Sequence, residues 1–107
     1  MVIRRFDVYL IDLEPTVGSE LRKTPPCLVI SPDDMNRYLN TVLIAPMTTQ
    51  GKAYPSRVPC YFDGKSGHIA LDQLRVIDKS RLVKRLGRID ITSQRSVLDV
   101  LARLFAE

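Results

Sequence analysis

The feature that most limits the fold of this chain is the shortness of its apolar runs, each of which is closed by turn-forming residues. A typical run, Cys27 to Ile30, is followed directly by Ser31 and Pro32. Runs of this length fit β-strands and are far below the roughly 20 apolar residues needed to span a bilayer. A chain of 107 residues with 45% apolar and 26% charged residues can bury one core. We therefore expect a single domain over residues 1–107 without a membrane-spanning segment.

Several segments have the composition of strands. The predicted strands are Phe6–Leu13, Cys27–Ile30, Thr41–Ala45, Arg57–Phe62 and His68–Leu74. Phe6 is expected to pack at the start of its strand. The last two strands flank residues 63–67, Asp-Gly-Lys-Ser-Gly, which predict a hairpin with a loop longer than two residues. Pro59 indicates an edge strand or a bulge, because proline cannot donate to a strand ladder. The stretch from Leu82 to Ile89 fits either a strand or a short helix.

Two segments carry helix signals. Ser31 as N-cap, Pro32 at the first helical position and two acids in the first turn predict a brief helix to about Tyr38. From Thr92 onward the apolar period is helical, and the predicted core-facing residues are Val97, Leu98, Leu101, Leu104 and Phe105. Many short strands with one closing helix predict a mainly β protein. We expect a small, strongly bent β-barrel with a C-terminal helix and a short helix after the second strand, and an α+β sandwich is the alternative.

The cysteines and the histidine give no sign of a metal site. Cys27 and Cys60 each lie inside an apolar run, there is no C-x-x-C pair, and His68 is the one histidine in the sequence. A zinc site needs several such ligands at close spacing. We therefore predict two buried, reduced thiols that serve packing, with no metal and no other cofactor. Residues 1–7 lack the apolar region of a signal peptide, so we expect a cytoplasmic protein.

The positive charge of the chain is concentrated in one stretch. The formal net charge is +4, and the stretch from Arg75 to Arg88 contains six basic residues and the single acid Asp78. These basic residues are Arg75, Lys79, Arg81, Lys84, Arg85 and Arg88. Such a stripe is often only a solvated face, yet a phosphate backbone is its natural partner. Arg22 and Lys23 form a second cluster in a long loop, which favours a polyanion over a small neutral substrate.

Four segments carry recognisable motifs that follow one another over nearly the whole chain. They are residues 7–20, which end in D-x-x-P-T-x-G-S-E, residues 26–32, residues 45–55 with P-x-T-T-Q, and residues 70–78 with D-Q-x-R. Together they resemble the MazF/PemK (Kid) toxins of type II toxin–antitoxin systems. The resemblance implies an SH3-like barrel of the CcdB/PemK type and a homodimer. It also implies metal-independent cleavage of single-stranded RNA such as mRNA, and neutralisation by a cognate MazE-like antitoxin.

The resemblance also assigns site residues. It implies a catalytic role for Thr48 of P-x-T-T-Q and for Glu20 of G-S-E, although Glu20 is equally suited to ordering its own loop. Asp72 matches the aspartate that the PemK branch treats as its base. Further polar residues of these motifs and their flanks are predicted to bind RNA. They are Arg22, Lys23, Thr49, Gln50, Gln73 and Arg75.

One position departs from the family. The catalytic arginine that precedes the proline of the R-P-x-x-V pattern is replaced by Pro25, which has no charge, donor or titrating group. In the PemK branch the acid is an arginine, and its position is occupied here by Ala70, while the loop histidine of that branch is Ser19. Loss of a charge-stabilising group typically costs about 10²- to 10³-fold in rate. The resemblance therefore implies a weakened or inactive ribonuclease.

Two other classes of function stay open at this point. The gyrase poison CcdB is similar in fold but acts through a protein interface and typically ends in an aromatic and polar tail, whereas this chain ends Leu104-Phe105-Ala106-Glu107. A non-catalytic module that binds RNA or an antitoxin would keep the interfaces without the cleavage. Cell-free cleavage of a defined RNA distinguishes these alternatives from a ribonuclease.

Overall fold

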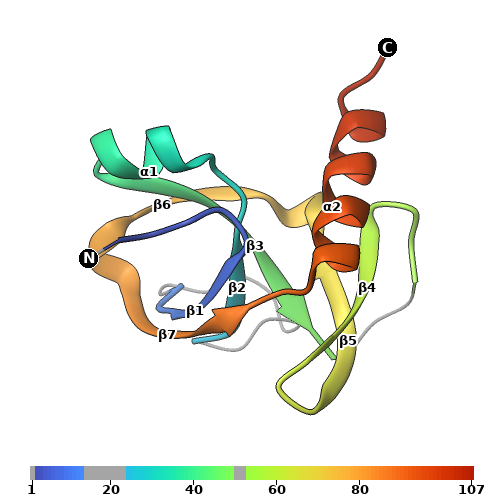
Figure 1. Ribbon diagram of the computed structural model, residues 1–107, viewed down its shortest axis with the longest axis horizontal. Coiled ribbons are helices and arrows are strands. Elements are labelled where there is room, and N and C mark those ends of the chain that lie inside the picture. The colour runs from blue at the N-terminus through green and yellow to red at the C-terminus, as the bar shows by residue number, and fades with distance from the viewer. Residues whose placement is uncertain (1, 14–23, 50–52) are drawn as a thin grey trace.

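The structure, a computed structural model, describes residues 2–13, 24–49 and 53–107. Figure 1 shows a bent sheet with one long helix against it and a short helix at the opposite end. The strands are β1 (Asp7–Ile11), β2 (Pro26–Val29), β3 (Thr41–Thr48), β4 (Arg57–Phe62), β5 (Lys65–Ala70), β6 (Arg75–Asp78) and β7 (Leu82–Arg88). The helices are α1 (Asp33–Tyr38) and α2 (Ile91–Leu104), and η1 (Leu71–Gln73) and η2 (Lys79–Arg81) are short 3-10 turns.

The sheet is antiparallel and is organised around β3. Its strand order is β4-β5-β3-β2-β1-β7, and β6 also pairs with β3. The first half of β3 pairs with β6, with Thr41 opposite Asp78, whereas its end pairs with β5, with Thr48 opposite His68. On its other side β3 pairs with β2. Because β6 and β5 share one edge of β3, the sheet changes direction along this strand, and the end of β3 lies against the β4–β5 hairpin.

The predicted mainly β fold, with a C-terminal helix and a short helix after the second strand, is confirmed. Among the described residues no ladder joins β4 to β7, the two ends of the strand order, so the barrel-like sheet is open. These strands instead approach through a side chain, because a Cβ added to Gly87 in β7 would lie 3.3 Å from Cζ of Phe62 in β4. Gly87 has a φ of 153°, which also favours glycine. The stretch from Leu82, which fitted either a strand or a short helix, is strand β7.

Alternation along the strands buries side chains on both faces of the sheet. In β1, Val8 packs in one apolar cluster and Tyr9 in the other, and in β2, Leu28 and Cys27 divide in the same way. We call these the α2-side cluster, which includes Val97 of α2, and the far-side cluster. Strands buried on both faces explain the continuous apolar runs in the sequence. Burial raises the pKa of the Cys27 thiol to about 12, and the prediction of free, buried cysteines is confirmed.

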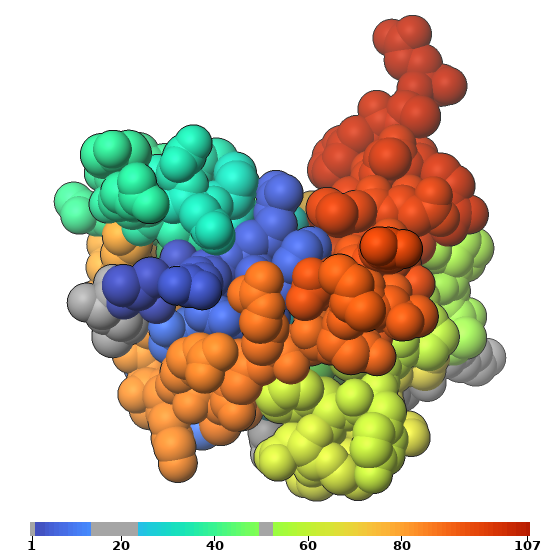
Figure 2. Space-filling model, viewed as in Figure 1, coloured from blue at the N-terminus to red at the C-terminus, as the bar shows by residue number. Residues whose placement is uncertain are grey.

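The C-terminal helix covers the sheet with fewer residues than predicted. Val97 is fully buried and Leu101 is half-buried against the α2-side cluster. The prediction that the whole apolar face covers the core is wrong, because Leu98 in the middle of the helix is exposed and the C-terminal end of the chain projects beyond the rest of the molecule (Figure 2). The predicted core residues that are exposed instead are Leu98, Leu104 and Phe105.

The short helix α1 ends at Tyr38 as predicted, but its N-terminal capping differs from the prediction. Pro32 is the N-cap residue, and no side chain caps the helix. The hydroxyl of Ser31 donates to the side-chain oxygen of the buried Asn36 and accepts a hydrogen bond from the backbone N–H of Leu43 at 3.1 Å. Ser31 therefore joins α1 to β3, and the prediction that it is the N-cap is wrong.

The β4–β5 hairpin turns in two residues, so the prediction of a longer loop is wrong. Asp63 and Gly64 have φ values of 52° and 77°, and the type I′ turn requires positive φ at both positions. As a result β5 begins at Lys65, earlier than the sequence pattern indicated, and ends at Ala70. Pro59 lies in β4, which is an end strand of the sheet, so the prediction of an edge position is confirmed.

Asp7 is a buried carboxylate at the start of β1, where Phe6 packs as predicted. Asp7 accepts hydrogen bonds from the backbone N–H of Arg4 at 3.1 Å, from Arg85 at 3.3 Å and from Arg88 at 3.4 Å. Removing the Asp7 carboxylate leaves these three donors without this acceptor, so Asp7→Ala should lower the free energy of unfolding by about 2–4 kcal/mol. Urea unfolding measures this loss, and Asp7→Asn, which keeps an acceptor, should lose less. Wild-type stability of Asp7→Ala would show that the network contributes nothing.

Candidate functional site

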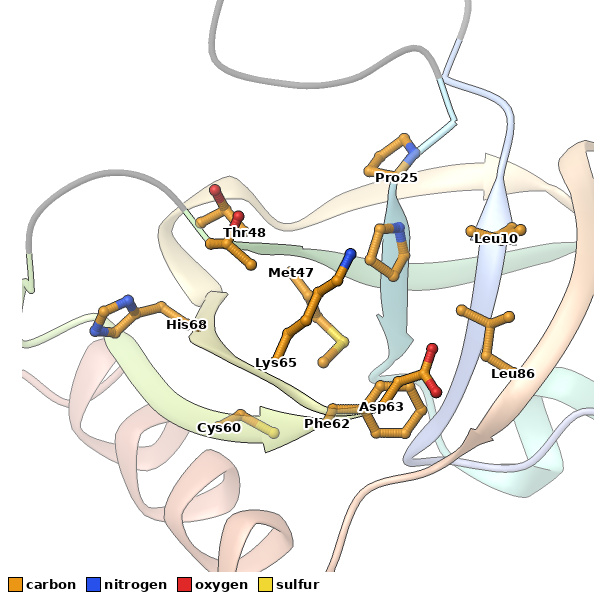
Figure 3. A pocket seen from close by; sticks show the side chains of 13 residues that line it. Leu10, Pro25, Met47, Thr48, Cys60, Phe62, Asp63, Lys65, His68 and Leu86 are labelled. Carbon is orange, nitrogen blue, oxygen red and sulfur yellow. The ribbon is translucent and has the colours of Figure 1, made fainter.

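A pocket of about 350 Å³ lies between the end of β3, the β4–β5 hairpin and the start of β2 (Figure 3). Its apolar side includes Met47, Phe62 and Leu86, which pack against the α2-side cluster. The described polar side chains that line it are Thr48, Thr49, Asp63, Lys65 and His68. A concave site with an apolar wall and a few convergent polar groups is the usual form of a binding or active site.

The structure brings three of the predicted site residues together in this pocket: Pro25, Thr48 and Thr49. Pro25 is buried immediately before β2, and its carbonyl accepts a hydrogen bond from the N–H of Ile11 at 3.2 Å, which fixes it beside β1. Thr48 is the last residue of β3 and is half-buried. Residues that lie far apart in the sequence thus face one cavity.

The remaining predicted site residues fall into two groups. Glu20, Arg22, Lys23 and Gln50 lie outside the described residues. Asp72, Gln73 and Arg75 are described but do not line the pocket. The buried side-chain oxygen of Gln73 receives no hydrogen bond from any residue within 2–13, 24–49 or 53–107.

Arg75 projects on the face of the sheet that carries the far-side cluster. It pairs directly with Ile44 of β3 and is two residues from Ile77, and both isoleucines belong to the far-side cluster. Side chains at this spacing share a face of a strand. Thr48 lies four residues after Ile44 in β3, so Arg75 and Thr48 share a face of the sheet although Arg75 does not line the pocket.

Asp72 is held in an ion pair away from the pocket. Arg57 Nε lies 3.1 Å from Asp72 Oδ1, and Arg57 Nη2 lies 3.3 Å from Oδ2. The guanidinium also stacks over the ring of Tyr54 at 5.0 Å. Burial alone raises the pKa of Asp72, but the hydrogen bonds and charge of Arg57, with bonds from the backbone and Ser56, outweigh it and hold the pKa below its ordinary value. A carboxylate stabilised in its ionised form is a weaker base, so its proton-accepting role stays a prediction.

The basic stripe from Arg75 to Arg88 does not form one continuous free surface. The Lys79 ammonium donates to the carbonyl of Asn36, and Arg81 donates to the carbonyl of Asp12 at 3.1 Å. Arg85 and Arg88 both reach Asp7, as described above. Much of the stripe thus joins β7 and η2 to neighbouring segments.

Lys65 is the cationic side chain among the described pocket-lining residues, and its place in the site was not predicted from the sequence. Figure 3 shows its ammonium reaching into the pocket, between the Thr48 side and the Pro25 side. A signal was present in the sequence. A two-residue turn at Asp63 and Gly64 pairs Lys65 with Phe62 and directs both side chains toward the core side of the hairpin.

Gly67 allows the hairpin to approach the end of β3 closely. A Cβ added to Gly67 would lie 2.4 Å from the carbonyl oxygen of Thr48, a backbone atom that cannot swing away. Gly67→Ala should therefore displace the hairpin from Thr48 and lower the free energy of unfolding by about 1–3 kcal/mol. Urea unfolding checks this, with Ser66→Ala, at an exposed neighbouring position, as the control. Unchanged stability of Gly67→Ala would contradict the close approach.

The remaining reactive groups do not point to another chemistry. Burial raises the pKa of the Cys60 thiol, although a hydrogen bond from Ser93 acts in the opposite direction, so the reactive thiolate is disfavoured. Within the described ranges, no group of three or more His, Cys, Asp or Glu side chains is placed to hold a metal ion. In the same part of the chain, no helix is long and apolar enough to cross a membrane.

Comparison with known proteins gives consistent matches over most of the chain. Residues 4–105 match the family model of the PemK-like, MazF-like toxins of type II toxin–antitoxin systems. The chain is 36% identical over 96 residues to the endoribonuclease EndoA of Bacillus subtilis (strain 168), covering 84% of this chain and 83% of the relative. Crystalline MazF from Deinococcus radiodurans has a TM-score of 0.81 at 26% identity, covering 97% of this chain and 96% of that chain. A MazE–MazF structure from the same organism has a TM-score of 0.74 at 25% identity, with the same coverage.

Proposed function

This chain belongs to the family of PemK-like, MazF-like toxins of type II toxin–antitoxin systems, and from that premise we propose that it cleaves single-stranded RNA in the pocket beside Thr48. One observation carries the assignment of the site. The position of the family's arginine, Pro25, and the threonine of the P-x-T-T-Q motif, Thr48, line the same pocket. The relative EndoA is named as an endoribonuclease, which supports the same reaction here.

The reaction transfers a phosphodiester to the neighbouring 2′-hydroxyl or to water. A base accepts the proton of the attacking oxygen, an acid protonates the departing 5′-oxygen, and hydrogen-bond donors hold the charge that grows on the phosphate. The hydroxyl of Thr48 is suited to the last of these tasks, since it lines the pocket at the end of a rigid strand. Pro25 supplies no donor, so we expect a rate below that of family members with an arginine at this position.

We propose that the toxin is a single domain that acts as a cytoplasmic homodimer and is neutralised by a MazE-like antitoxin. The MazE–MazF structure supports a protein partner of this kind. Exposed apolar side chains on and after α2, Leu104 at 42% and Phe105 at 73%, support a protein interface at this end of the molecule. We expect sedimentation at micromolar concentration to show a dimer, and a strict monomer would count against this part of the proposal.

Cleavage of a long single-stranded messenger RNA in the presence of EDTA tests the proposed function. The wild-type chain should give discrete fragments, and Thr48→Val, which removes the hydroxyl but keeps a branched side chain, should be about 10²-fold slower. Thr41→Val is the matched control, because it makes the same substitution at the opposite end of β3. If the wild-type chain leaves every RNA of a broad panel intact, the enzyme function is wrong and a binding module takes its place.

A further inference from the structure

The charge distribution inside the pocket distinguishes Lys65 from the other described basic residues. Among the described lining residues, Lys65 supplies the cation, Asp63 supplies an anion, and His68 lies at the Thr48 side. Figure 3 shows the Asp63 carboxylate beside Phe62, whereas the Lys65 ammonium extends toward the part of the pocket between Thr48 and Pro25. The Lys65 ammonium and the Thr48 side chain thus line the same pocket.

The Lys65 ammonium is available to a ligand. Within the described ranges it has no hydrogen bond or ion pair with the protein, although Asp63 is two residues away. By contrast, Arg57 binds Asp72, and both Arg85 and Arg88 bind Asp7. A lysine that lines a concave site without a carboxylate partner is suited to bind a phosphate as a point charge.

The backbone beneath Lys65 is held in place. The two-residue turn fixes the start of β5, and β4 and β5 pair without a register shift from Arg57 opposite Ala70 to Phe62 opposite Lys65. Gly67 then places the hairpin against the Thr48 carbonyl. Met47, Phe62 and Leu86 form the apolar wall of the pocket, while Lys65 itself is exposed to solvent. The stem of the side chain therefore starts from a defined point, three residues before His68, which pairs with Thr48.

From this arrangement we propose that Lys65 is the phosphate-binding cation of the pocket and stabilises the charge that develops during RNA cleavage. This inference rests on the proposed function. As the 2′-oxygen or a water oxygen bonds to phosphorus and the bond to the 5′-oxygen breaks, negative charge grows on the non-bridging oxygens. Lys65 donates hydrogen bonds to those oxygens and keeps its own protons. The attacking oxygen loses its proton to the base, and the acid supplies a proton to the 5′-oxygen. Lys65 therefore neither gains nor loses a proton in the reaction.

Two readouts test this role in the full-length protein, with long single-stranded RNA as the probe. Lys65→Met keeps the unbranched stem and removes the charge, so the single-turnover cleavage rate should fall about 10²-fold while stability is unchanged. RNA affinity measured over a series of salt concentrations should show a slope of log K against log salt that is smaller by about 0.7, because one phosphate contact is lost. Lys65→Arg should recover most of both effects. Arg95→Ala, which removes one charge from an exposed position on α2, is the control for net charge.

The outcomes separate this inference from the proposed function. A wild-type chain that cleaves RNA while Lys65→Met cleaves equally fast with an unchanged salt slope would overturn the role of Lys65 and leave the ribonuclease function intact. Equal losses in Lys65→Met and Arg95→Ala would reduce the effect to net charge and would also overturn it. A wild-type chain that cleaves no RNA would overturn both proposals. A loss of cleavage rate and of salt dependence that is confined to Lys65→Met and recovered in Lys65→Arg supports the role of Lys65 as the phosphate-binding cation.

Discussion

The variant Pro25→Arg is expected to cleave single-stranded RNA about 10²-fold faster than the wild-type chain, because it adds a charged donor to the pocket where negative charge develops. Pro25 lines this pocket on the opposite side from Lys65, so a longer side chain can extend into the cavity. The carbonyl at position 25 would still accept the N–H of Ile11, and Pro26 would still begin β2. The backbone requires little change for the substitution.

Single-turnover rates of four proteins measure this gain and its dependence on Lys65. They are the wild-type chain, Pro25→Arg, Lys65→Met and the double variant. If both cations act on the same phosphate, Pro25→Arg should increase the cleavage rate by a larger factor in the Lys65→Met background than in the wild-type background. In the Lys65→Met background the new arginine is the only one of the two cations present. Equal factors in the two backgrounds would mean that the two positions act independently. Equal rates for wild type and Pro25→Arg would contradict the placement of the reacting phosphate between them.

The fold was largely predictable because its signals are local. Strand-length apolar runs, the helical period after Thr92 and the edge position of Pro59 each correspond to an observed element. The wrong predictions involve properties that depend on distant contacts. The Ser31 hydroxyl bonds Asn36 and Leu43 rather than capping its own helix. Phe105 has a helical spacing but extends past the sheet, and periodicity alone cannot report how far the covered surface reaches.

The site was predictable only in part, and the reason lies in how it is assembled. Motif resemblance identified Pro25 and Thr48, and the fold brings them to one pocket. Lys65 belongs to no such motif, and its side-chain direction depends on whether the turn contains two residues or five. The Asp-Gly pair at the tip decides this, since both residues adopt positive φ. Arg75 does not line the pocket, and a basic stripe in the sequence does not show which of its residues border a cavity, so its role in RNA binding stays a prediction.

The second large effect is expected at Asp72, where Asp72→Ala should lower the free energy of unfolding by about 2–4 kcal/mol. The substitution removes the two-pronged carboxylate partner of Arg57, whose side chain is only 6% exposed, whereas Asp72 is 36% exposed and partly hydrated. Because Asp72 is partly hydrated, the expected loss is smaller than the typical cost of breaking a fully buried ion pair. Urea unfolding measures the loss. Cleavage per folded molecule should be unchanged, and a stable Asp72→Ala protein without cleavage would instead establish Asp72 as the base implied by the PemK branch.

Acid unfolding is a second, independent test of the ion pair between Asp72 and Arg57. The pKa of Asp72 in the folded chain is lowered, so the folded state favours the ionised carboxylate more than the unfolded state does. The resulting stabilisation is fully present above the unfolded value of about 3.9 and is lost as the pH falls through the lower folded value. The difference in unfolding free energy between wild type and Asp72→Asn should therefore be constant above about pH 5 and shrink below about pH 4. A difference that grows as the pH falls would require a carboxyl that binds its proton more tightly in the folded chain, which is the opposite of an ion pair with Arg57.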